Sequence, residues 1–185
     1  MNTTQIILDY DQVPPLIKKL RAQNKSIVLT QGTFDMIHIG HGRYLASAKS
    51  HGDILFVGVD SDEKVRTRKG PERPVVPESE RLEMLTHLKA VDYVVLKPLS
   101  APKWQLIKLI KPNVLITTES TYTPTQVKQL EKICGQVMVL KPQAVTSTSA
   151  KLRRLQIGFA QHFSQALAQK VQTAIDELVN QLKKN

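Results

Sequence analysis

The chain has 185 residues, 41 % of them hydrophobic and 23 % charged, which excludes general disorder and fits one compact domain with an appended element. Its formal net charge of +10 at pH 7 favours anionic partners such as nucleotides, sugar phosphates or nucleic acid. The only cysteine, Cys134, excludes an intramolecular disulfide and a cysteine cluster for zinc, and its apolar neighbours predict a buried thiol. The polar N-terminus lacks a signal-peptide core, and no apolar run reaches the length of a membrane span. We therefore expect a cytoplasmic protein without a membrane partner.

Helical patterns and short apolar, β-branched runs alternate along the chain. In chain order they are a helix at 13–23, a strand at 27–30, a helix at 42–50, a strand at 54–59, a helix at 78–89, a strand at 93–96, a helix at 102–110, a strand at 114–116, a helix at 125–133 and a strand at 137–140. The apolar runs do not alternate with polar residues, which is typical of strands buried on both faces. This order predicts a doubly wound α/β fold with a five-stranded, mainly parallel sheet.

The last segment has a different pattern. Between residues 158 and 184, apolar residues recur three or four positions apart, which predicts one long amphipathic helix. We divide the chain into a domain at 1–155 and a helical extension at 156–185. The apolar stripe must pack on the domain itself or on a second subunit, and we expect a homodimer.

The segment after the first predicted strand carries the candidate chemistry. Gly32 permits a tight turn or close approach of a ligand to the backbone. His38 and His41 are three positions apart, where a helix N-terminus would gather both imidazoles beside free N–H groups that favour phosphate. Asp35 supplies a carboxylate that can hold Mg²⁺ bridging phosphate oxygens. Two histidines at this spacing are more often capping or surface groups, but the glycines, the carboxylate and the position after a strand favour a phosphate site.

These residues also carry a family resemblance. The run Gly-Thr-Phe-Asp-x-x-His-x-Gly-His at 32–41 resembles the signature of the cytidylyltransferase-like nucleotidyltransferase superfamily. In that family the two histidines contact the NTP phosphates and stabilise the charge that develops during transfer. The resemblance therefore implies catalytic roles for His38 and His41. It implies nucleotide binding by the residues Gly32, Thr33, Phe34, Asp35 and Gly40.

The resemblance extends over residues 5–155. The segments 57–62 and 111–116 match later strands of the family, and Lys-Gly-Pro-Glu-Arg-Pro-Val at 69–75 resembles a loop of D-glycero-β-D-manno-heptose 1-phosphate adenylyltransferases. This loop implies ATP as the preferred nucleotide and a sugar phosphate as the acceptor. CTP with glycerol 3-phosphate or a phosphorylated amino-alcohol is the alternative, because the shared motifs bind triphosphate and metal rather than the base.

Further site residues follow from the resemblance. Lys69 is expected to fold over the triphosphate. The simpler alternative is that it is a solvated loop lysine. Arg81 is expected to hold the active-site end together or contact substrate, with an intrahelical ion pair as the alternative. Ser147, Thr148 and Ser149 resemble the family's Ser-Thr-Thr run at a helix start, which grips phosphate; helix capping alone is the alternative.

One segment departs from the family pattern. After the fourth predicted strand, heptose-phosphate adenylyltransferases read Lys-Gly-Gly-Asp-Tyr, and this chain reads Thr-Thr-Glu-Ser-Thr-Tyr at 117–122. Both glycines are absent, and Glu119 takes the place of the aspartate if the register shifts by one. Because this segment normally helps to form the nucleotide and acceptor pocket, Glu119 is a candidate for substrate binding.

These observations predict an Mg²⁺-dependent nucleotidyltransferase that releases pyrophosphate. The acceptor phosphate is already ionised near neutral pH, because its second pKa is about 6, so the reaction requires no general base. A non-catalytic nucleotide-binding regulatory protein is a second alternative, supported by the altered segment at 117–122. A nucleic-acid binder ranks last, because only 5 % of the residues are aromatic and no basic–aromatic pattern is present.

Overall fold

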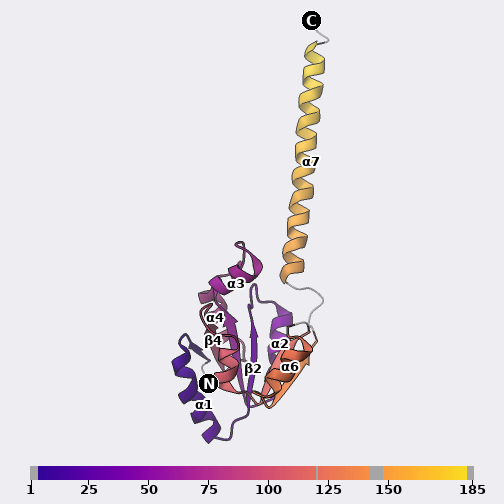
Figure 1. Ribbon diagram of the computed structural model, residues 1–185. Helices are drawn as coiled ribbons and strands as arrows, with labels where there is room; N and C mark the ends of the chain where they lie inside the picture. Colours follow the sequence, from indigo (N-terminus) through magenta and orange to yellow (C-terminus); the bar gives the residue numbers. More distant parts are fainter. Residues whose placement is uncertain (1–3, 120, 142–147, 183–185) are drawn as a thin grey trace. The chain divides into compact units, whose positions relative to one another are not determined.

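The computed structural model describes residues 4–119, 121–141 and 148–182. The chain forms two compact units, Met1–Val145 and Thr146–Asn185, and each is described by itself. The first unit contains a parallel sheet with helices on both faces (Figure 1). The predicted α/β class and doubly wound architecture are confirmed.

The sheet of the first unit has six strands rather than the predicted five. They are β1 (Gln5–Ile7), β2 (Ile27–Gly32), β3 (Ile54–Asp60), β4 (Tyr93–Lys97), β5 (Val114–Thr118) and β6 (Gln136–Leu140). Their order is β1-β4-β3-β2-β5-β6, and every neighbouring pair is parallel. The missed strand, β1, lies at an edge, has only three residues and buries only Ile7. Its apolar run, Ile-Ile-Leu at 6–8, is short.

Within the described residues of this unit, six α-helices connect the strands. They are α1 (Val13–Ala22), α2 (Ile39–Lys49), α3 (Asp62–Lys69), α4 (Glu78–Thr86), α5 (Gln105–Ile110) and α6 (Pro124–Glu131). The helix α2 begins three residues earlier than predicted, because His38 caps it. The helix α3 was not predicted; it buries only Val65, and Ser61 caps its first turn by accepting from the Lys64 amide.

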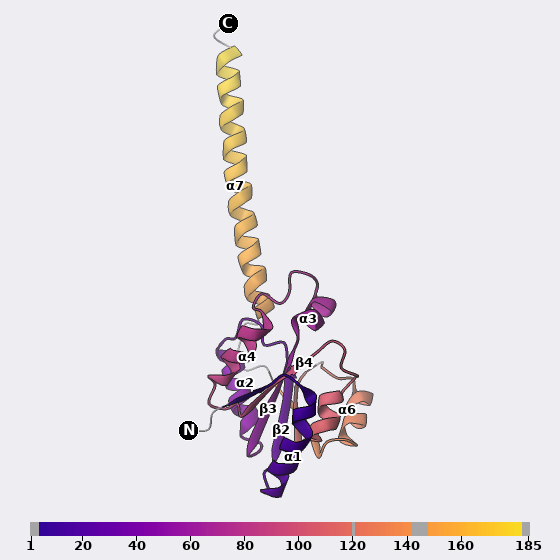
Figure 2. The ribbon, with the colours of Figure 1, turned by 90° about the vertical axis from the view of Figure 1, so that its left-hand side faces the viewer.

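Two hydrophobic clusters cover the two faces of the sheet. Alternate residues of β2 point to opposite faces, so Ile27 and Leu29 pack with α1, α5 and α6, whereas Val28 packs with α2 and α4. Figure 2 shows α2 and α4 on one side of the sheet and α1 and α6 on the other. Cys134 is buried in the first of these clusters, as predicted, and burial raises the pKa of its thiol to about 11.

The second unit contains one long helix, α7 (Thr148–Leu182). It begins ten residues before the predicted start at residue 158, and the predicted domain boundary after residue 155 falls inside it. Phe159 and Phe163 stack along this helix with ring centroids 6.4 Å apart. Within the described parts of the chain, no helix is long and apolar enough to cross a membrane.

Candidate active site

The candidate site lies where the strand order reverses. The strand β2 pairs with β3 on one side and β5 on the other, and this switch point is where doubly wound sheets bind ligands, outside the carboxyl ends of the strands. At the end of β2, a Cβ added to Gly32 would lie 3.0 Å from the Phe34 ring. Phe34 itself has φ 52°, a left-handed backbone that turns the chain sharply toward α2. A side chain at residue 32 would therefore require the Phe34 ring to shift by a few tenths of an ångström.

His38 and His41 form the N-terminal cap of α2. The Nδ1 atom of His38 accepts a hydrogen bond from the Gly40 amide at 3.1 Å, and the Nδ1 atom of His41 accepts one from the His38 amide at 3.2 Å. The two rings lie with centroids 4.1 Å apart. The capping role that the spacing of the two histidines suggested is therefore confirmed, and it fixes the orientation of both rings.

This cap also determines where each imidazole carries its proton. An Nδ1 atom that accepts a hydrogen bond has no proton of its own, so these contacts assign the proton of each neutral ring to Nε2. In this tautomer each ring has its N–H donor at Nε2. Capping and phosphate binding use different nitrogens of the same rings, so the two roles are compatible.

Asp35 holds the loop that follows α3. Its carboxylate accepts from the Val75 amide at 3.1 Å and from the Val76 amide at 3.0 Å, and it forms an ion pair with Arg73 at 2.9 Å. The residue is 4 % exposed. These contacts join the Gly32–His41 segment to the loop that resembles heptose-phosphate adenylyltransferases.

The predicted Mg²⁺ role of Asp35 stays a prediction. In the described part of the chain, no group of three or more His, Cys, Asp or Glu residues is arranged to hold a metal. A lone carboxylate that already has backbone and arginine partners does not form a resident metal site. Mg²⁺ in nucleotide enzymes is commonly bound by one or two carboxylates together with substrate phosphates. The donor set at Asp35 therefore fits only a metal that arrives with the nucleotide.

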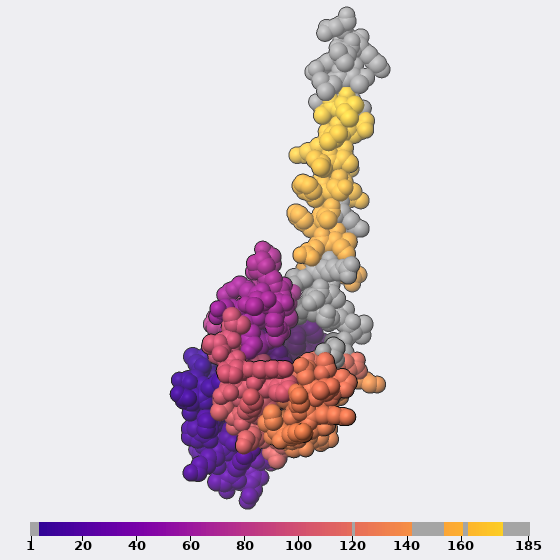
Figure 3. Space-filling view, viewed as in Figure 1, coloured from indigo at the N-terminus to yellow at the C-terminus, as the bar shows by residue number. Residues whose placement is uncertain are grey.

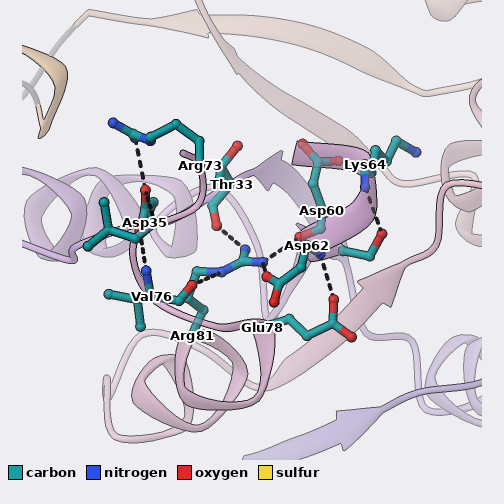
Figure 4. A network of polar contacts seen from close by, with 11 residues as sticks. Thr33, Asp35, Asp60, Asp62, Lys64, Arg73, Val76, Glu78 and Arg81 are labelled. Carbon is teal, nitrogen blue, oxygen red and sulfur yellow. Dashed lines mark hydrogen bonds and ion pairs between the residues drawn. The ribbon is translucent and has the colours of Figure 1, made fainter. Parts of the chain in front are cut away.

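Arg81 joins four segments beneath the site (Figure 4). It is 1 % exposed, and its guanidinium donates to the carbonyls of Thr33, Asp60 and Val76. It also forms an ion pair with Asp62 at 2.7 Å. These contacts fix the ends of β2 and β3 and the loop before α4. Direct contact of Arg81 with substrate stays a prediction.

Lys69 is the last residue of α3 rather than part of a loop. Desolvation, followed by the positive charges of Arg68 and Arg73, lowers its pKa. Glu119 follows β5 directly, at the carboxyl end of the strand that neighbours β2. The structure thus places Lys69 and Glu119 after strands at the same edge of the sheet as His38.

The predicted hydroxyl run lies in the second unit. Ser147 falls outside the described residues, and Thr148 and Ser149 form the first turn of α7, where the backbone alone is described. A helix therefore does start at this run, as the motif implies. The proposed grip of these hydroxyls on phosphate stays a prediction.

Two buried polar atoms near Asp35 have no hydrogen-bond partner within the described residues. They are the hydroxyl oxygen of Thr33, a residue that is 7 % exposed, and Nε of Arg73. Such groups cost free energy unless a ligand or water satisfies them. Thr33 lies two residues before Asp35 in the chain, and Arg73 forms an ion pair with the Asp35 carboxylate. A bound water or a group of a ligand would supply the partner that these atoms lack among the described residues.

A further network at the end of β3 was missed by sequence reasoning. Asp60 is 1 % exposed, and its carboxylate pairs with Lys97 at 2.9 Å and with Arg68 at 3.0 Å. Desolvation lowers the pKa of Lys97, and the Asp60 charge acts against this effect. A charged residue that ends an apolar strand is the sequence signal for such a site, and both Asp60 and Lys97 show it.

A cavity lies at the carboxyl edge of the sheet, on the face covered by α1 and α5. It has a volume of about 320 Å³ and opens beside Gln31, Lys97 and Trp104. Figure 3 shows this face, where the pink segment around residue 100 lies between α1 (indigo) and the orange segment around residue 125. No local motif indicated the cavity, because its lining comes from residues far apart in the chain.

Comparisons with known proteins agree with this geometry. Residues 29–154 match the family model described as Cytidylyltransferase-like. The bifunctional protein HldE of a Nitratiruptor species is 43 % identical over 114 residues, covering 62 % of this chain and 24 % of the relative. The bifunctional protein HldE of Geotalea uraniireducens is 35 % identical over 155 residues, covering 82 % of this chain and 31 % of the relative. The chain thus spans about a quarter to a third of these relatives.

Solved structures show the same fold. The lipopolysaccharide core biosynthesis protein from Thermoplasma volcanium GSS1 superposes with a TM-score of 0.54 at 25 % identity, covering 64 % of this chain and 96 % of that one. Pantoate-beta-alanine ligase from Francisella tularensis, solved with beta-gamma ATP and beta-alanine, gives a TM-score of 0.57 at 19 % identity, covering 75 % of this chain and 67 % of that one. At this identity, the similarity to the ligase shows a shared fold and nothing further.

Proposed function

The chain belongs to the cytidylyltransferase-like family of nucleotidyltransferases, and we propose that it transfers a nucleoside monophosphate from an NTP to a phosphorylated sugar. The observation that carries this proposal is the cap of α2. Both histidines turn Nδ1 toward the backbone and keep their Nε2 proton. Two Nε2–H donors at a helix N-terminus form a phosphate site.

Phosphate oxygens in this site would gain further contacts. The Thr33 hydroxyl and the Arg73 Nε are buried donors that have no hydrogen-bond partner within the described residues. Lys69 lies at the end of α3, directly before the loop that Asp35 holds. Mg²⁺ enters as part of the NTP substrate, with Asp35 as the carboxylate closest in sequence to the histidines. The site then neutralises the triphosphate by several preorganised groups.

The reaction follows from these roles. An unprotonated oxygen of the acceptor phosphate forms a bond to the α-phosphorus of the NTP, and the bond from that phosphorus to the bridging oxygen of pyrophosphate breaks. Pyrophosphate leaves with the electron pair, and no proton needs to be removed from the acceptor. His38, His41 and Lys69 stabilise the negative charge that builds on the α-phosphate and the leaving group. Catalysis rests on orientation and charge stabilisation.

ATP and D-glycero-β-D-manno-heptose 1-phosphate are the preferred substrates. Their support is the resemblance of the 69–75 loop to heptose-phosphate adenylyltransferases and the similarity to the bifunctional HldE proteins. That loop is held against Asp35 by two backbone amides and by Arg73. These contacts support a place for this loop beside the proposed phosphate site.

The test is a substrate screen. ATP and CTP are each combined with heptose 1-phosphate, glycerol 3-phosphate and phosphoethanolamine in the presence of Mg²⁺, and pyrophosphate release is recorded. We expect the largest turnover with ATP and heptose 1-phosphate. Larger turnover with CTP than with ATP would show that the protein transfers a cytidylyl group rather than an adenylyl group. No release from any pair, with nucleotide binding retained, would favour a regulatory nucleotide-binding protein.

A further inference from the structure

The helix α7 carries an exposed apolar stripe. Its members are spaced four positions apart, and each of them is exposed: Leu155, Phe159, Phe163, Leu167, Val171 and Ile175. Phe159 is 74 % exposed and Phe163 is 62 % exposed. Soluble proteins rarely leave a continuous apolar surface of this kind in water, and where they do it marks an interaction site. The stripe therefore calls for a partner.

The first unit is too small to cover α7 along its whole length. The helix has 35 residues, so it is about 52 Å long at 1.5 Å per residue. A compact unit of 145 residues has a radius of gyration of about 15 Å and hence a diameter of about 40 Å. Part of the apolar face of α7 therefore needs another partner, since helices gain most of their stability by packing that face.

The polar residues beside the stripe favour a protein partner over a lipid surface. Between residues 155 and 175, Lys170 is the only lysine, arginine, aspartate or glutamate, and the polar positions are mostly glutamine. Helices that lie on anionic membranes carry several Lys and Arg residues along their polar face. Neutral amides, in contrast, allow two copies of one helix to approach each other without charge repulsion.

The stripe is symmetric about residue 165. Reversing the helix about this residue exchanges apolar residues with apolar residues: Leu155 with Ile175, Phe159 with Val171, and Phe163 with Leu167. Two antiparallel copies would therefore bring each phenylalanine against an aliphatic side chain. Two parallel copies in register would bring each phenylalanine against its own copy. Because large residues interdigitate best with smaller ones, the antiparallel match packs better.

The charge of α7 also favours the antiparallel direction. The sequence is basic before the stripe, at Lys151, Arg153 and Arg154, and acidic after it, at Asp176 and Glu177. Antiparallel copies place the basic start of one helix beside the acidic positions of the other, and their macrodipoles attract. Parallel copies would bring like charges together at both ends.

The spacing of the stripe determines how two copies meet. Four residues turn about 400°, so the stripe winds about 40° around the helix at each step. Ridges of residues spaced four apart interdigitate when two helices cross at about −50°. Contact then centres on Phe163 and Leu167. A buried phenylalanine contributes about 150–250 Å², so Phe159 and Phe163 of two copies supply a large part of the roughly 1,200–2,000 Å² of a stable interface.

We propose that α7 pairs with α7 of a second copy in the antiparallel direction, with a two-fold axis near residue 165. The inference gives the expected homodimer a surface, a direction and a centre. The pairing segment, residues 155–175, begins directly after the family match at 29–154. It contains none of the candidate site residues, so the inference stands apart from the proposed function.

Spin labels at two exposed positions of the full chain, Ser164→Cys and Thr173→Cys, measure the direction by EPR spectroscopy. The only native thiol, Cys134, is buried and has a pKa of about 11, so the label attaches to the engineered cysteine. In the antiparallel pair the two copies of residue 164 lie within about 10 Å, next to the axis. The two copies of residue 173, which lies opposite residue 157, are about 24 Å apart along the helices.

Reversal of charge tests the pairing of the ends. Asp176→Lys with Glu177→Lys makes both ends of α7 basic, so the dimer Kd at low ionic strength should rise about tenfold. Adding Arg153→Glu with Arg154→Glu exchanges the two ends and should restore the affinity. Glu63→Lys with Glu83→Lys makes the same change of net charge at exposed residues of α3 and α4. This matched control should dimerise like the parent in analytical ultracentrifugation.

Each other outcome overturns the proposal in its own way. Short distances at both labelled positions would show a parallel pair. A monomer at every concentration, without coupling between labels, would show that the first unit covers the stripe. Binding to phosphatidylglycerol vesicles with loss of the coupling would identify a lipid surface as the partner. Pyrophosphate release is measured independently, so failure of the pairing and failure of the proposed function are distinguishable.

Discussion

The two faces of the sheet at the end of β2 are built in different ways. On the α2 face, His38 and His41 are locked by hydrogen bonds to the backbone of the helix that they cap. On the α5 face, the cavity is lined by long side chains such as Lys97, which pairs with Asp60, and Lys103, whose Nζ lies over the Trp104 ring. The first arrangement suits one invariant group, a phosphate, at a fixed position. The second is arranged by contacts between side chains.

Arg81 offers the largest test, because it supports both faces at once. Its guanidinium is 1 % exposed and bonds the ends of β2 and β3. Arg81→Met leaves Asp62 and three carbonyls without this partner, so we expect the free energy of unfolding to fall by about 3–5 kcal/mol. Urea unfolding measures the loss. Arg66→Met, an exposed arginine of α3, should change stability by less than about 0.5 kcal/mol, and equal losses in the two variants would contradict this role.

The second test separates capping from phosphate binding at His38. In His38→Asn the side-chain oxygen still caps α2, but the Nε2 donor is gone. We expect turnover to fall about 10²- to 10³-fold, while stability stays close to that of the parent. His38→Ala should lose the same activity and, in addition, about 1 kcal/mol of stability. An asparagine variant that turns over normally would reduce His38 to a capping residue.

The contrast between the faces also explains what the sequence could predict. The segment 32–41 was predicted because its glycine, carboxylate and histidines lie close together in the chain and directly follow a strand. The strands β2 and β3 were predicted because both their faces are buried. Trp104 and Tyr122 were not predicted as neighbours, because only the fold brings their rings to 6.4 Å.

Two elements were missed for energetic reasons. The edge strand β1 has three residues and buries one of them, so its short apolar run at 6–8 gives a weaker signal than the longer and more deeply buried strands. The helix α3 buries only Val65, but it has acidic residues in its first turn and basic residues in its last, and Ser61 caps it. Those capping and dipole signals mark a helix without an apolar face.

A smaller effect is expected at Thr33. Its buried hydroxyl has no partner within the described residues, so Thr33→Val should leave the stability of the free protein unchanged or slightly higher. If the hydroxyl binds the triphosphate, the variant should bind ATP about five- to tenfold more weakly. Calorimetric titration measures this affinity, and Thr33→Ser, which keeps the hydroxyl, is the control. Equal ATP affinity in the valine and serine variants would place the hydroxyl outside the nucleotide site.

The smallest effect concerns alkaline pH on the cavity face. The pKa values of Tyr10 and Tyr122 are about 12 in the folded protein, against 10.0 for an ordinary phenol. Between pH 10 and 12 the folded state therefore holds more protons than the unfolded state, so the stability from these phenols is lost as the pH rises through this window. Tyr10→Phe should make the fall in unfolding free energy shallower. An unchanged slope would show that this phenol is not desolvated.

The long helix α7 allows the expected homodimer to be tested separately. Its residues Leu155, Phe159, Phe163, Leu167 and Val171 are spaced four apart. If this stripe pairs two copies, Phe159→Glu with Phe163→Glu should yield a monomer in analytical ultracentrifugation, whereas a change of Gln172 to Glu should not. A monomeric parent protein would exclude the dimer.

The central claim is that an acceptor phosphate attacks the α-phosphorus of the NTP at the histidine cap. The most direct measurement uses heptose 1-phosphate whose three non-bridging phosphate oxygens are labelled with ¹⁸O, together with unlabelled Mg–ATP. Mass spectrometry should find all three labels in the nucleoside-diphosphate sugar and none in pyrophosphate, and His38→Asn should form this product about 10²- to 10³-fold more slowly. Label in AMP or in pyrophosphate, or ADP in place of pyrophosphate, would contradict the account.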